Sequence, residues 1–252
     1  AFADRAVHSG DPAFWPVPVK WLTSKRYARS LADEITLEKT TPTKDIGAGQ
    51  VPKESSQTTH MSIIDRFGNA ISSTQTINTG LGSKYVAEGT GFVMNNEMDD
   101  FGSKKGRPNA FGAVSLSDAN IIIPGKRPLS SMSPTLVFDQ QGRLIMAVGT
   151  PGGTKIMTSV LQVIVNTVDF EMSPKDAVFA ARIHHQWKRE ELLFERDGAP
   201  AKSVLEALKR IRGDLILSKK RFCNVQAVFR DPDSGRLTAV SDRRGTGQPK
   251  GW

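Results

Sequence analysis

One threonine in this sequence has the surroundings that a self-activated nucleophile needs. Thr58 stands where a linker-like stretch rich in Thr, Pro, Lys, Gly and Ser (residues 40–57) gives way to an alternating, strand-like segment. If the bond between Gln57 and Thr58 is cut, the freed α-amine, with a pKa of ~7.7–8.0, can act as base for the threonine hydroxyl. A Gly-x-Ser-x-Gly elbow is missing, and no Ser/His/Asp triad can be assembled. The sequence therefore indicates Thr58 as a nucleophile and Gln57–Thr58 as a self-processing junction.

A glycine-rich turn could hold the negative charge that develops when such a nucleophile attacks a carbonyl group. Gly149–Gly153 runs from an apolar strand directly into an apolar helix, which places successive backbone N–H groups at a helix N-terminus. No Gly-Lys-Ser/Thr follows, so the turn is not a phosphate loop, and the glycine spacing of dinucleotide-binding folds is absent. The turn is therefore either an oxyanion receptor or a plain tight turn.

Three other clusters could contact a ligand, and each has a structural alternative. Ser130 and Ser131 could bind a substrate or cap a turn. Glu97 and Asp99–Asp100 could hold a cation or form a solvated acidic loop. His184–His185 are neighbours that point to opposite sides of an extended segment, and no third histidine lies near them, so no metal site is expected there.

The composition sets limits on other classes of function. The 252 residues carry 34 Lys+Arg against 26 Asp+Glu, a formal charge of +8, but the basic residues are scattered and form only short runs such as Lys219–Arg221. Nucleic acid is therefore not an expected partner, and binding of another polyanion is a minor alternative. The lone Cys223 excludes an intramolecular disulfide and a cysteine-based zinc site. No apolar run approaches the ~20 residues of a membrane helix, so no membrane insertion is expected.

The segments around Thr58 predict a hairpin with one polar face. Residues 58–65 and 70–78 form its strands, across a short turn. Successive side chains of a strand alternate, so the even-numbered polar side chains from Thr58 onward share one face and the odd-numbered, more apolar ones the other. An odd number of loop residues brings the polar faces together and puts Thr58 beside Thr76 or Asn78. A polar face in a hairpin otherwise built to be buried requires an explanation.

The rest of the chain predicts a layered α+β fold, because strands, helices and strands follow one another in blocks without repeated βαβ units. The other predicted elements are a helix over 25–35 capped by Thr23 or Ser24, a short strand over 91–95, a hairpin of 134–138 and 144–148, a helix over 155–168, a helix from Ser173–Pro174, a helix over 202–210, a strand near Leu215 and a hairpin over 225–240.

Ordered motifs along nearly the whole chain resemble those of the γ-glutamyltranspeptidase family. They are Gln57–His60, Thr76–Thr79, Asn95–Phe101, Lys126–Pro134, Gly152–Gly153 and His184–Trp187. The resemblance implies the αββα sandwich of N-terminal-nucleophile hydrolases, made as a precursor that cuts itself into a large and a small subunit. Residues 1–57 then correspond to the C-terminal part of the large subunit with its linker, and residues 58–252 to the small, catalytic subunit. The abrupt start at Ala1 fits a cut through such a precursor, which would leave the sandwich incomplete.

The resemblance also implies a role for each matching residue. Thr58 is the nucleophile and, with Gln57, the self-processing site, and Thr76 supplies a hydroxyl hydrogen-bonded to it. Phe111 stands where many bacterial members have a lid tyrosine, so the hydroxyl contact of the lid is lost. Asn78, Glu97 and Asp100 would bind the α-amino and α-carboxylate groups of the substrate, with Asp100 pairing the ammonium. Ser130 and Ser131 would bind the α-carboxylate. The N–H groups of Gly152 and Gly153 would form the oxyanion hole.

The activity implied by the resemblance is acyl transfer through a threonine acyl-enzyme, without a cofactor. The γ-glutamyl group of glutathione or another γ-glutamyl amide would pass to water or to the amine of an amino acid or peptide. The implied partner is the remaining large-subunit segment, which would complete the core and supply an arginine for the substrate α-carboxylate. Family members are typically periplasmic, secreted or on the outer face of a membrane, so a periplasmic or extracellular location is expected.

Two other functions stay open. A related acylase, acting on glutaryl or cephalosporin substrates, would share this machinery and differ only in its pocket. A non-catalytic chain that persists uncleaved would serve only as a binding or assembly partner.

Overall fold

Strands and helices follow one another in blocks, as the α+β prediction requires. The computed structural model describes residues 1–36, 38–42, 58–187, 192–195, 198–212, 216–218 and 221–251. Its helices are α1 (Phe2–His8), α2 (Val19–Leu22), α3 (Lys25–Asp33), α4 (Lys155–Val168), α5 (Pro174–Phe179) and α6 (Lys202–Arg212), with short 3-10 turns η2 (Glu97–Asp100) and η3 (Asp118–Asn120). Its strands are β1 (Thr58–Ile64), β2 (Ala70–Thr76), β3 (Thr135–Phe138), β4 (Leu144–Gly149), β5 (Ile183–His184), β6 (Leu193–Glu195), β7 (Ile216–Ser218), β8 (Gln226–Arg230) and β9 (Leu237–Ser241).

The β1–β2 hairpin has one of the two registers that the sequence predicts. The strands are antiparallel and Thr58 lies opposite Thr76, because the loop 65–69 holds an odd number of residues. The predicted polar face is the one that points inward: His60 is buried, with 8% of its surface exposed. The alternate side chains of β1 face outward, and Met61 and Ile63 are 45% and 49% exposed. The buried face therefore carries mainly polar side chains, and Ile64 at the end of β1 is its buried apolar residue.

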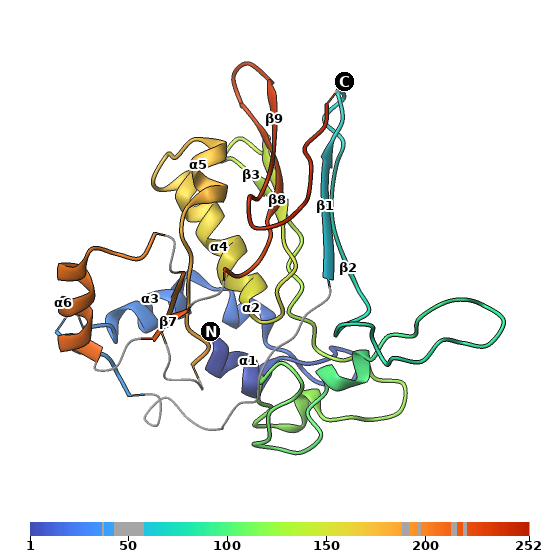
Figure 1. The fold of residues 1–252 in the computed structure, drawn as a ribbon. Coiled ribbons are helices and arrows are strands. Elements are labelled where there is room, and N and C mark those ends of the chain that lie inside the picture. The colour runs from blue at the N-terminus through green and yellow to red at the C-terminus, as the bar shows by residue number, and fades with distance from the viewer. Residues whose placement is uncertain are drawn as a thin grey trace.

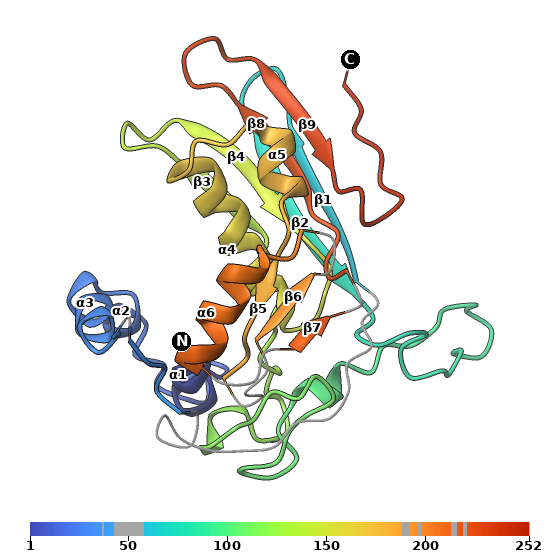
Figure 2. The same cartoon turned by 60° about the vertical axis from the view of Figure 1, so that its left-hand side comes forward.

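The hairpin covers one face of a four-stranded antiparallel sheet with the strand order β3-β4-β8-β9. Helices α4 and α5 cover the other face (Figure 1, Figure 2). The main hydrophobic core lies between the helices and the sheet, where Ile156 and Val163 of α4 pack in one buried cluster with Met146 and Val148 of β4. Full burial of such a side chain contributes about 1.5–3 kcal/mol. The described residues thus form helix, sheet and hairpin layers of the predicted sandwich.

A smaller sheet with the order β5-β6-β7 lies beside α6 (Figure 2). Buried ion pairs connect it to the main sheet: Arg182 Nη2 lies 2.6 Å from Asp242 Oδ2, and Arg244 pairs with both Asp242 and Glu195. Attraction to these two arginines lowers the pKa of Asp242 against the opposing effect of burial. Because breaking one member of a buried pair leaves an uncompensated charge, this cluster fixes how the two sheets meet.

Most helix boundaries agree with the sequence. Ser24 caps α3, since its hydroxyl accepts a hydrogen bond from the Tyr27 N–H at 3.1 Å, and the Ser173–Pro174 pair begins α5 as predicted. Helix α3 ends at Asp33, and Ile35 beyond it is 71% exposed. The predicted apolar stripe of this helix therefore does not reach its expected length, and no residue of α3 is buried.

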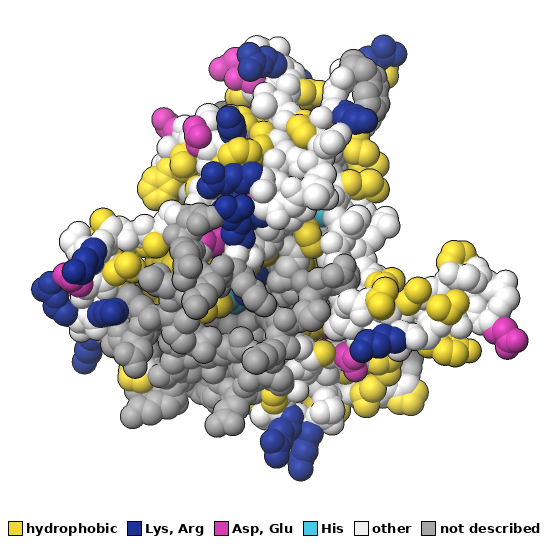
Figure 3. Space-filling model, in the orientation of Figure 1, with side chains coloured by type: hydrophobic (Ala, Val, Ile, Leu, Met, Phe, Trp, Pro, Cys, Tyr) yellow, Lys and Arg dark blue, Asp and Glu magenta, His cyan; other side chains and the backbone are white. Residues whose placement is uncertain are grey.

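The predicted strand over 91–95 is wrong. Residues 79–95 form a lobe that protrudes from the body, and Val86 and Val93 make only an isolated bridge (Figure 1). Gly89 and Gly91 have positive φ angles of 74° and 72°, which end an extended conformation. Hydrophobic side chains gather on this lobe (Figure 3), and they include Leu81, Tyr85, Val86, Phe92 and Met94.

The predicted junction lies outside the described residues, because they resume at Thr58. Gln57 and most of the predicted linker are therefore not placed. Among the helices that are described, none combines the length and the apolar character needed to cross a membrane.

Candidate active site

Thr58 and Thr76 form a hydrogen-bonded pair of hydroxyl groups at one end of the hairpin. Thr58 Oγ1 donates to Thr76 Oγ1 at 3.1 Å, and the Asn78 N–H donates to the same Thr76 oxygen at 2.8 Å. Asn78 has a positive φ of 77°, which asparagine tolerates better than most residues, and its side chain donates to the Asn96 carbonyl at 2.9 Å. The chain leaving β2 is thereby held in a tight turn that orients Thr76 toward Thr58.

The acidic turn η2 lies next to this pair, because Asn78 bonds to Asn96 directly before it. Asp100 is buried, and burial, together with the negative charge of Glu97, raises its pKa to about 7, while Arg5 acts in the opposite direction. Burial also raises the pKa of Glu97. Glu97 Oε1 is buried and has no hydrogen-bond partner among the described residues. A pair of carboxyl groups in this state is suited to receive a cationic ligand group.

The serine segment contributes two hydroxyl groups from a loop before β3. Ser131 Oγ accepts a hydrogen bond from Arg5 Nη2 at 3.1 Å, and Ser130 Oγ accepts one from the Met132 N–H at 3.1 Å. Both serines still have their own hydroxyl proton to donate. Ser130 therefore does cap a turn in part, as one alternative predicts, whereas Ser131 is hydrogen-bonded to Arg5, which is distant in sequence.

The glycine turn lies between β4 and α4, as predicted. Gly152 has a φ of 145° and Gly153 a φ of 58°, and neither N–H donates a hydrogen bond to another described residue. A Cβ added at Gly152 would lie 2.3 Å from Cys223 Sγ, so the turn also requires glycine for space. N–H groups left open at the start of a helix of this length can receive an anion, as the oxyanion alternative requires.

A small cavity brings most of the predicted site residues together. Its wall contains Thr58, Thr76, Asn78, Asp100, Phe111, Ser130, Ser131 and Gly153, and apolar Met132 and Ile156 complete it. Glu97 and Gly152 lie beside wall residues and do not line the cavity themselves. The structure thus joins segments that are separated by nearly a hundred residues of sequence.

Phe111, the predicted lid residue, is a buried wall residue with 7% of its surface exposed. Its carbonyl oxygen accepts a hydrogen bond from Gln186 Nε2 at 3.2 Å. Gln186 Oε1 in turn accepts from Thr154 at 2.6 Å and lies 3.2 Å from His184 Nε2. The His184 motif therefore supports the wall of the cavity from behind.

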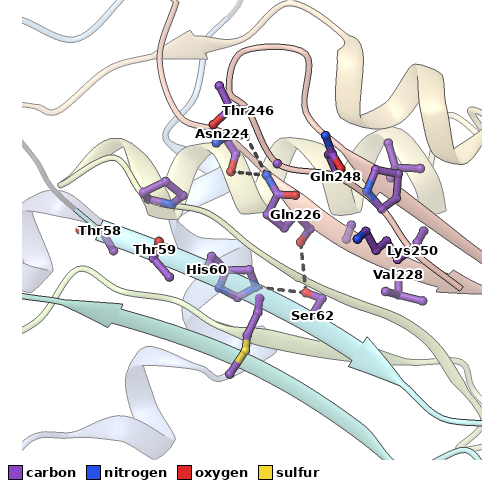
Figure 4. A pocket seen from close by; sticks show the side chains of 17 residues that line it. Thr58, Thr59, His60, Ser62, Asn224, Gln226, Val228, Thr246, Gln248 and Lys250 are labelled. Carbon is purple, nitrogen blue, oxygen red and sulfur yellow. Dashed lines mark hydrogen bonds between the residues drawn. The ribbon is translucent and has the colours of Figure 1, made fainter.

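A second cavity of about 410 Å³ also reaches Thr58 and lies between β1, β8, β9 and the C-terminal residues 246–250 (Figure 4). His60 and Ser62 line it, with the His60 Nε2 atom 3.0 Å from the Ser62 hydroxyl. Burial lowers the pKa of His60 to about 4, so the ring is neutral at neutral pH. Thr58 is the predicted site residue common to both cavities.

Sequence reasoning missed two residues of the site. Arg5 lies more than fifty positions before Thr58, and no periodicity or motif spacing connects it to the serine loop. Gln186 belongs to a motif that the resemblance includes, but its type alone assigned it no role. Only long-range contacts could identify Arg5, whereas the place of Gln186 in the His184–Trp187 motif is a usable signal.

Comparisons with known proteins identify the family of the chain. The family model described as gamma-glutamyltranspeptidase matches residues 1–252. The glutathione hydrolase proenzyme of Escherichia coli is 44% identical over 246 residues, which are 97% of this chain and 41% of that protein. The acylase ACY 1 proenzyme of a Pseudomonas species is 38% identical over 99% of this chain and 41% of its own length.

A solved structure gives the same result. The T380A mutant of Helicobacter pylori gamma-glutamyltranspeptidase superposes with a TM-score of 0.70 at 44% identity, over 74% of this chain and 100% of that one. The chain described here spans less than half the length of the curated relatives named above. Since the family model covers the chain from end to end, the chain belongs to the γ-glutamyltranspeptidase family.

Proposed function

We propose that this chain carries the nucleophile and most of the donor site of a γ-glutamyl transferase or hydrolase that acts on glutathione and other γ-glutamyl amides. The observation that supports this most directly is the cavity in which the Thr58–Thr76 hydroxyl pair meets Asp100 and the Ser130–Ser131 loop. A nucleophile, an acidic group and hydroxyl donors in one small cavity match a substrate that carries an amide, an ammonium and a carboxylate.

The chemical step is acyl transfer in two stages. Thr58 Oγ attacks the γ-carbonyl carbon, its proton passes to the Thr58 α-amine, and the tetrahedral oxyanion is stabilised by the N–H groups of Gly152 and Gly153. The oxyanion then collapses, the C–N bond breaks, and the α-amine returns the proton to the leaving amine. Water or the amine of an amino acid or peptide attacks the resulting Thr58 ester, which restores the hydroxyl. Thr76 holds the Thr58 hydroxyl in place, at 3.1 Å.

Recognition of the glutamyl group uses opposite charges at its α-carbon. The ammonium pairs with Asp100, beside Glu97, and the α-carboxylate accepts hydrogen bonds from Ser130 and Ser131, with Asn78 between the two groups. Pairing with an ammonium favours the ionised form of Asp100, against the burial that raises its pKa.

The same nucleophile would create its own amine. Thr58 Oγ attacks the Gln57 carbonyl carbon, the peptide bond breaks in an N→O shift, and water hydrolyses the ester, which leaves Thr58 with a free α-amine. This step would divide the chain into residues 1–57, the end of a large subunit, and residues 58–252, the small subunit. The proenzyme names of the relatives support such processing.

A partner segment would complete the enzyme. The outward side chains Met61, Ile63 and Ile71 of the hairpin are about half exposed, and the lobe over 79–95 exposes further large apolar groups. Apolar surface of this extent is typical of interfaces. The remaining large-subunit segment is the proposed cover, and it would also supply the arginine for the α-carboxylate. From the family resemblance we place the enzyme in the periplasm or outside the cell.

A glutaryl or cephalosporin acylase is the second candidate, because the Pseudomonas acylase proenzyme aligns over nearly the whole chain. The acidic pair argues against it, since a glutaryl group has no ammonium to pair with Asp100 and Glu97. Faster release of aniline from a glutaryl anilide than from a γ-glutamyl anilide would favour the acylase. A single intact 27.5 kDa species would favour the uncleaved, non-catalytic alternative.

Substitution of the nucleophile tests the proposal. The chain is produced with the upstream segment, and release of aniline from a γ-glutamyl anilide is measured together with intact mass. Thr58→Ala removes the attacking oxygen, so we expect loss of both cleavage and turnover, by a factor of about 10⁴ or more. Thr59→Ala is the matched control, because Thr59 is exposed on the opposite face of β1 and should keep both. Turnover unchanged in Thr58→Ala would refute the mechanism.

A further inference from the structure

The segment at the start of the chain is hydrogen-bonded to residues 116–117, in the long loop that precedes the serine pair. The Leu116 N–H donates to the Ala6 carbonyl at 2.7 Å, and the Ser117 hydroxyl donates to the Val7 carbonyl. Figure 1 shows α1 lying directly against the 100–130 loops. Although α1 lies before the proposed cleavage site, it packs against residues that follow that site.

An ion pair extends this attachment to the approach of the serine loop. Arg127 Nη2 lies 2.7 Å from Asp11 Oδ1, while its Nε and its backbone N–H both donate to Asp11 Oδ2. These hydrogen bonds lower the pKa of Asp11 well below its usual range. Three donors on one carboxylate define a direction as well as a distance. The chain therefore enters the Ser130–Ser131 segment from a fixed position.

Arg5 is the residue of α1 that reaches the site itself. Its Nη2 donates to Ser131 Oγ at 3.1 Å and to the Leu129 carbonyl at 3.3 Å. A guanidinium group can only donate, so the Ser131 oxygen accepts and its own proton stays available for another acceptor. Within the described part of the chain, no carboxylate lies within 4.0 Å of Arg5 to neutralise it. The positive charge of Arg5 therefore acts on the serine loop, to which it donates hydrogen bonds, and on Asp100.

Asp100 is the acidic group that this charge affects. Asp100 faces Glu97 and Asp99 of its own turn and Arg5 of α1, and the α-amine that cleavage would free at Thr58 belongs to the same cavity. The charge of Arg5 lowers the pKa of Asp100, whereas burial and the two neighbouring carboxylates raise it. Burial lowers the pKa of Arg5 only to about 10, so its charge is present at neutral pH.

We propose that Arg5 is a positioning residue of the donor site: it turns the Ser131 hydroxyl proton toward the substrate carboxylate and places a positive charge opposite Asp100. The inference rests on the proposed function and deepens it. Its consequence is that residues 1–11 stay in the working enzyme after cleavage at Thr58, because they hold part of the substrate site in place.

Charge-keeping and charge-removing variants test this in the complete, cleaved enzyme. In Arg5→Met, we expect the KM for a γ-glutamyl anilide to rise about 10–100-fold with a smaller change in kcat, because a charge-assisted, partly buried hydrogen bond to Ser131 is lost. The acidic limb of kcat/KM should move to higher pH, since Asp100 then ionises less readily. Arg5→Lys should keep the acidic limb of the kcat/KM pH profile near its original pH while KM stays raised. Lysine keeps the positive charge but lacks the planar guanidinium group whose N–H donors reach both Ser131 and Leu129.

Two controls separate this role from a general structural one. Arg29 is exposed on α3, and Arg29→Met removes the same charge, so it should leave both KM and the acidic limb unchanged. Ser131→Ala should raise KM in the normal enzyme but add little in the Arg5→Met background, which measures their coupling. If Arg5→Met fails to fold, Arg5→Lys still provides the KM test.

Glutamate binding without turnover separates the role of Arg5 from the nucleophilic role of Thr58. Binding of L-glutamate, measured by calorimetry in the Thr58→Ala background, needs no turnover, and we expect it to weaken about 10-fold or more in Arg5→Met. Unchanged KM, unchanged acidic limb and unchanged glutamate binding in Arg5→Met would overturn the role of Arg5, even where Thr58→Ala abolishes activity. Retained activity in Thr58→Ala with weaker glutamate binding in Arg5→Met would overturn only the mechanism.

Discussion

The inner and outer faces of the β1–β2 hairpin are built from the same two strands, yet polar side chains make up most of the inner face, with Ile64 buried at its end, while Met61, Ile63 and Ile71 lie outside. On the inner face, His60 is buried and its Nδ1 lies 2.7 Å from the Thr74 hydroxyl. On the outer face, Ile63 and Ile71 are directly paired across the strands and are 49% and 54% exposed. The usual order of burial is therefore reversed in the element that carries Thr58.

Hydrogen bonds make the inner face possible. Ser62 Oγ donates to the Gln226 carbonyl at 3.1 Å, and Ser72 Oγ donates to the Val148 carbonyl at 3.0 Å and accepts from the Thr135 N–H. Because such bonds have a direction, they fix the hairpin against the four-stranded sheet more exactly than apolar contacts would. The position of Thr58 relative to the glycine turn depends on this, since the turn directly follows β4 of that sheet.

Removal of the His60 imidazole ring from the inner face of the hairpin should have the largest effect on stability. In His60→Ala, the Thr74 and Ser62 hydroxyls lose a partner and a void opens beside Gly149, against whose Cα the ring packs. We expect the free energy of unfolding to fall by about 2–4 kcal/mol in a urea titration. Thr59→Ala on the outer face should change it by less than about 0.5 kcal/mol. Equal losses in the two variants would show that the two faces do not differ energetically.

Acid should weaken the same face. The pKa of His60 is about 4 in the folded chain and about 6.5 when unfolded, so the unfolded state binds more protons between these values. Stability is therefore complete above about pH 6.5 and decreases as the pH falls toward 4, by about 3 kcal/mol at most. His60→Gln should remove this part of the pH dependence. A urea series across this range in both proteins measures it, and parallel curves would contradict the assignment to His60.

The sequence predicts the hairpin well because its information is local. Alternation and an odd loop length limit the partner of Thr58 to Thr76 or Asn78, and the structure selects Thr76. Glycine and serine signals are enough for the starts of α4 and α5. The strand over 91–95 failed for a physical reason: an apolar run forms a strand only where a partner strand is available, and the lobe offers Val93 a single bridge.

The site was predictable where residue type and motif carried the role, and not where distant segments meet. Thr58, Asp100 and the serine pair were identified from the resemblance, and the structure places them in one cavity. Arg5 could not be found, because its contact with Ser131 spans more than a hundred residues and depends on how α1 docks. Which face of the hairpin is buried was equally out of reach, since alternation defines two faces but not the side on which the sheet lies.

The outer face should show the smallest effect on the chain itself and a large one on its assembly. Ile71→Lys places a charge on a half-exposed position, so the free energy of unfolding of the chain alone should change by only about 0.5 kcal/mol. If the upstream segment covers this face, the same charge would be buried without a partner, and co-purification of the two segments should be lost. Gln141→Lys, at the exposed tip of the β3–β4 hairpin, is the matched control and should leave assembly intact. Assembly that survives Ile71→Lys would mean that the apolar outer face is solvent-exposed in the working enzyme. The two faces would then differ only in the hydrogen bonds that the inner face makes to the four-stranded sheet.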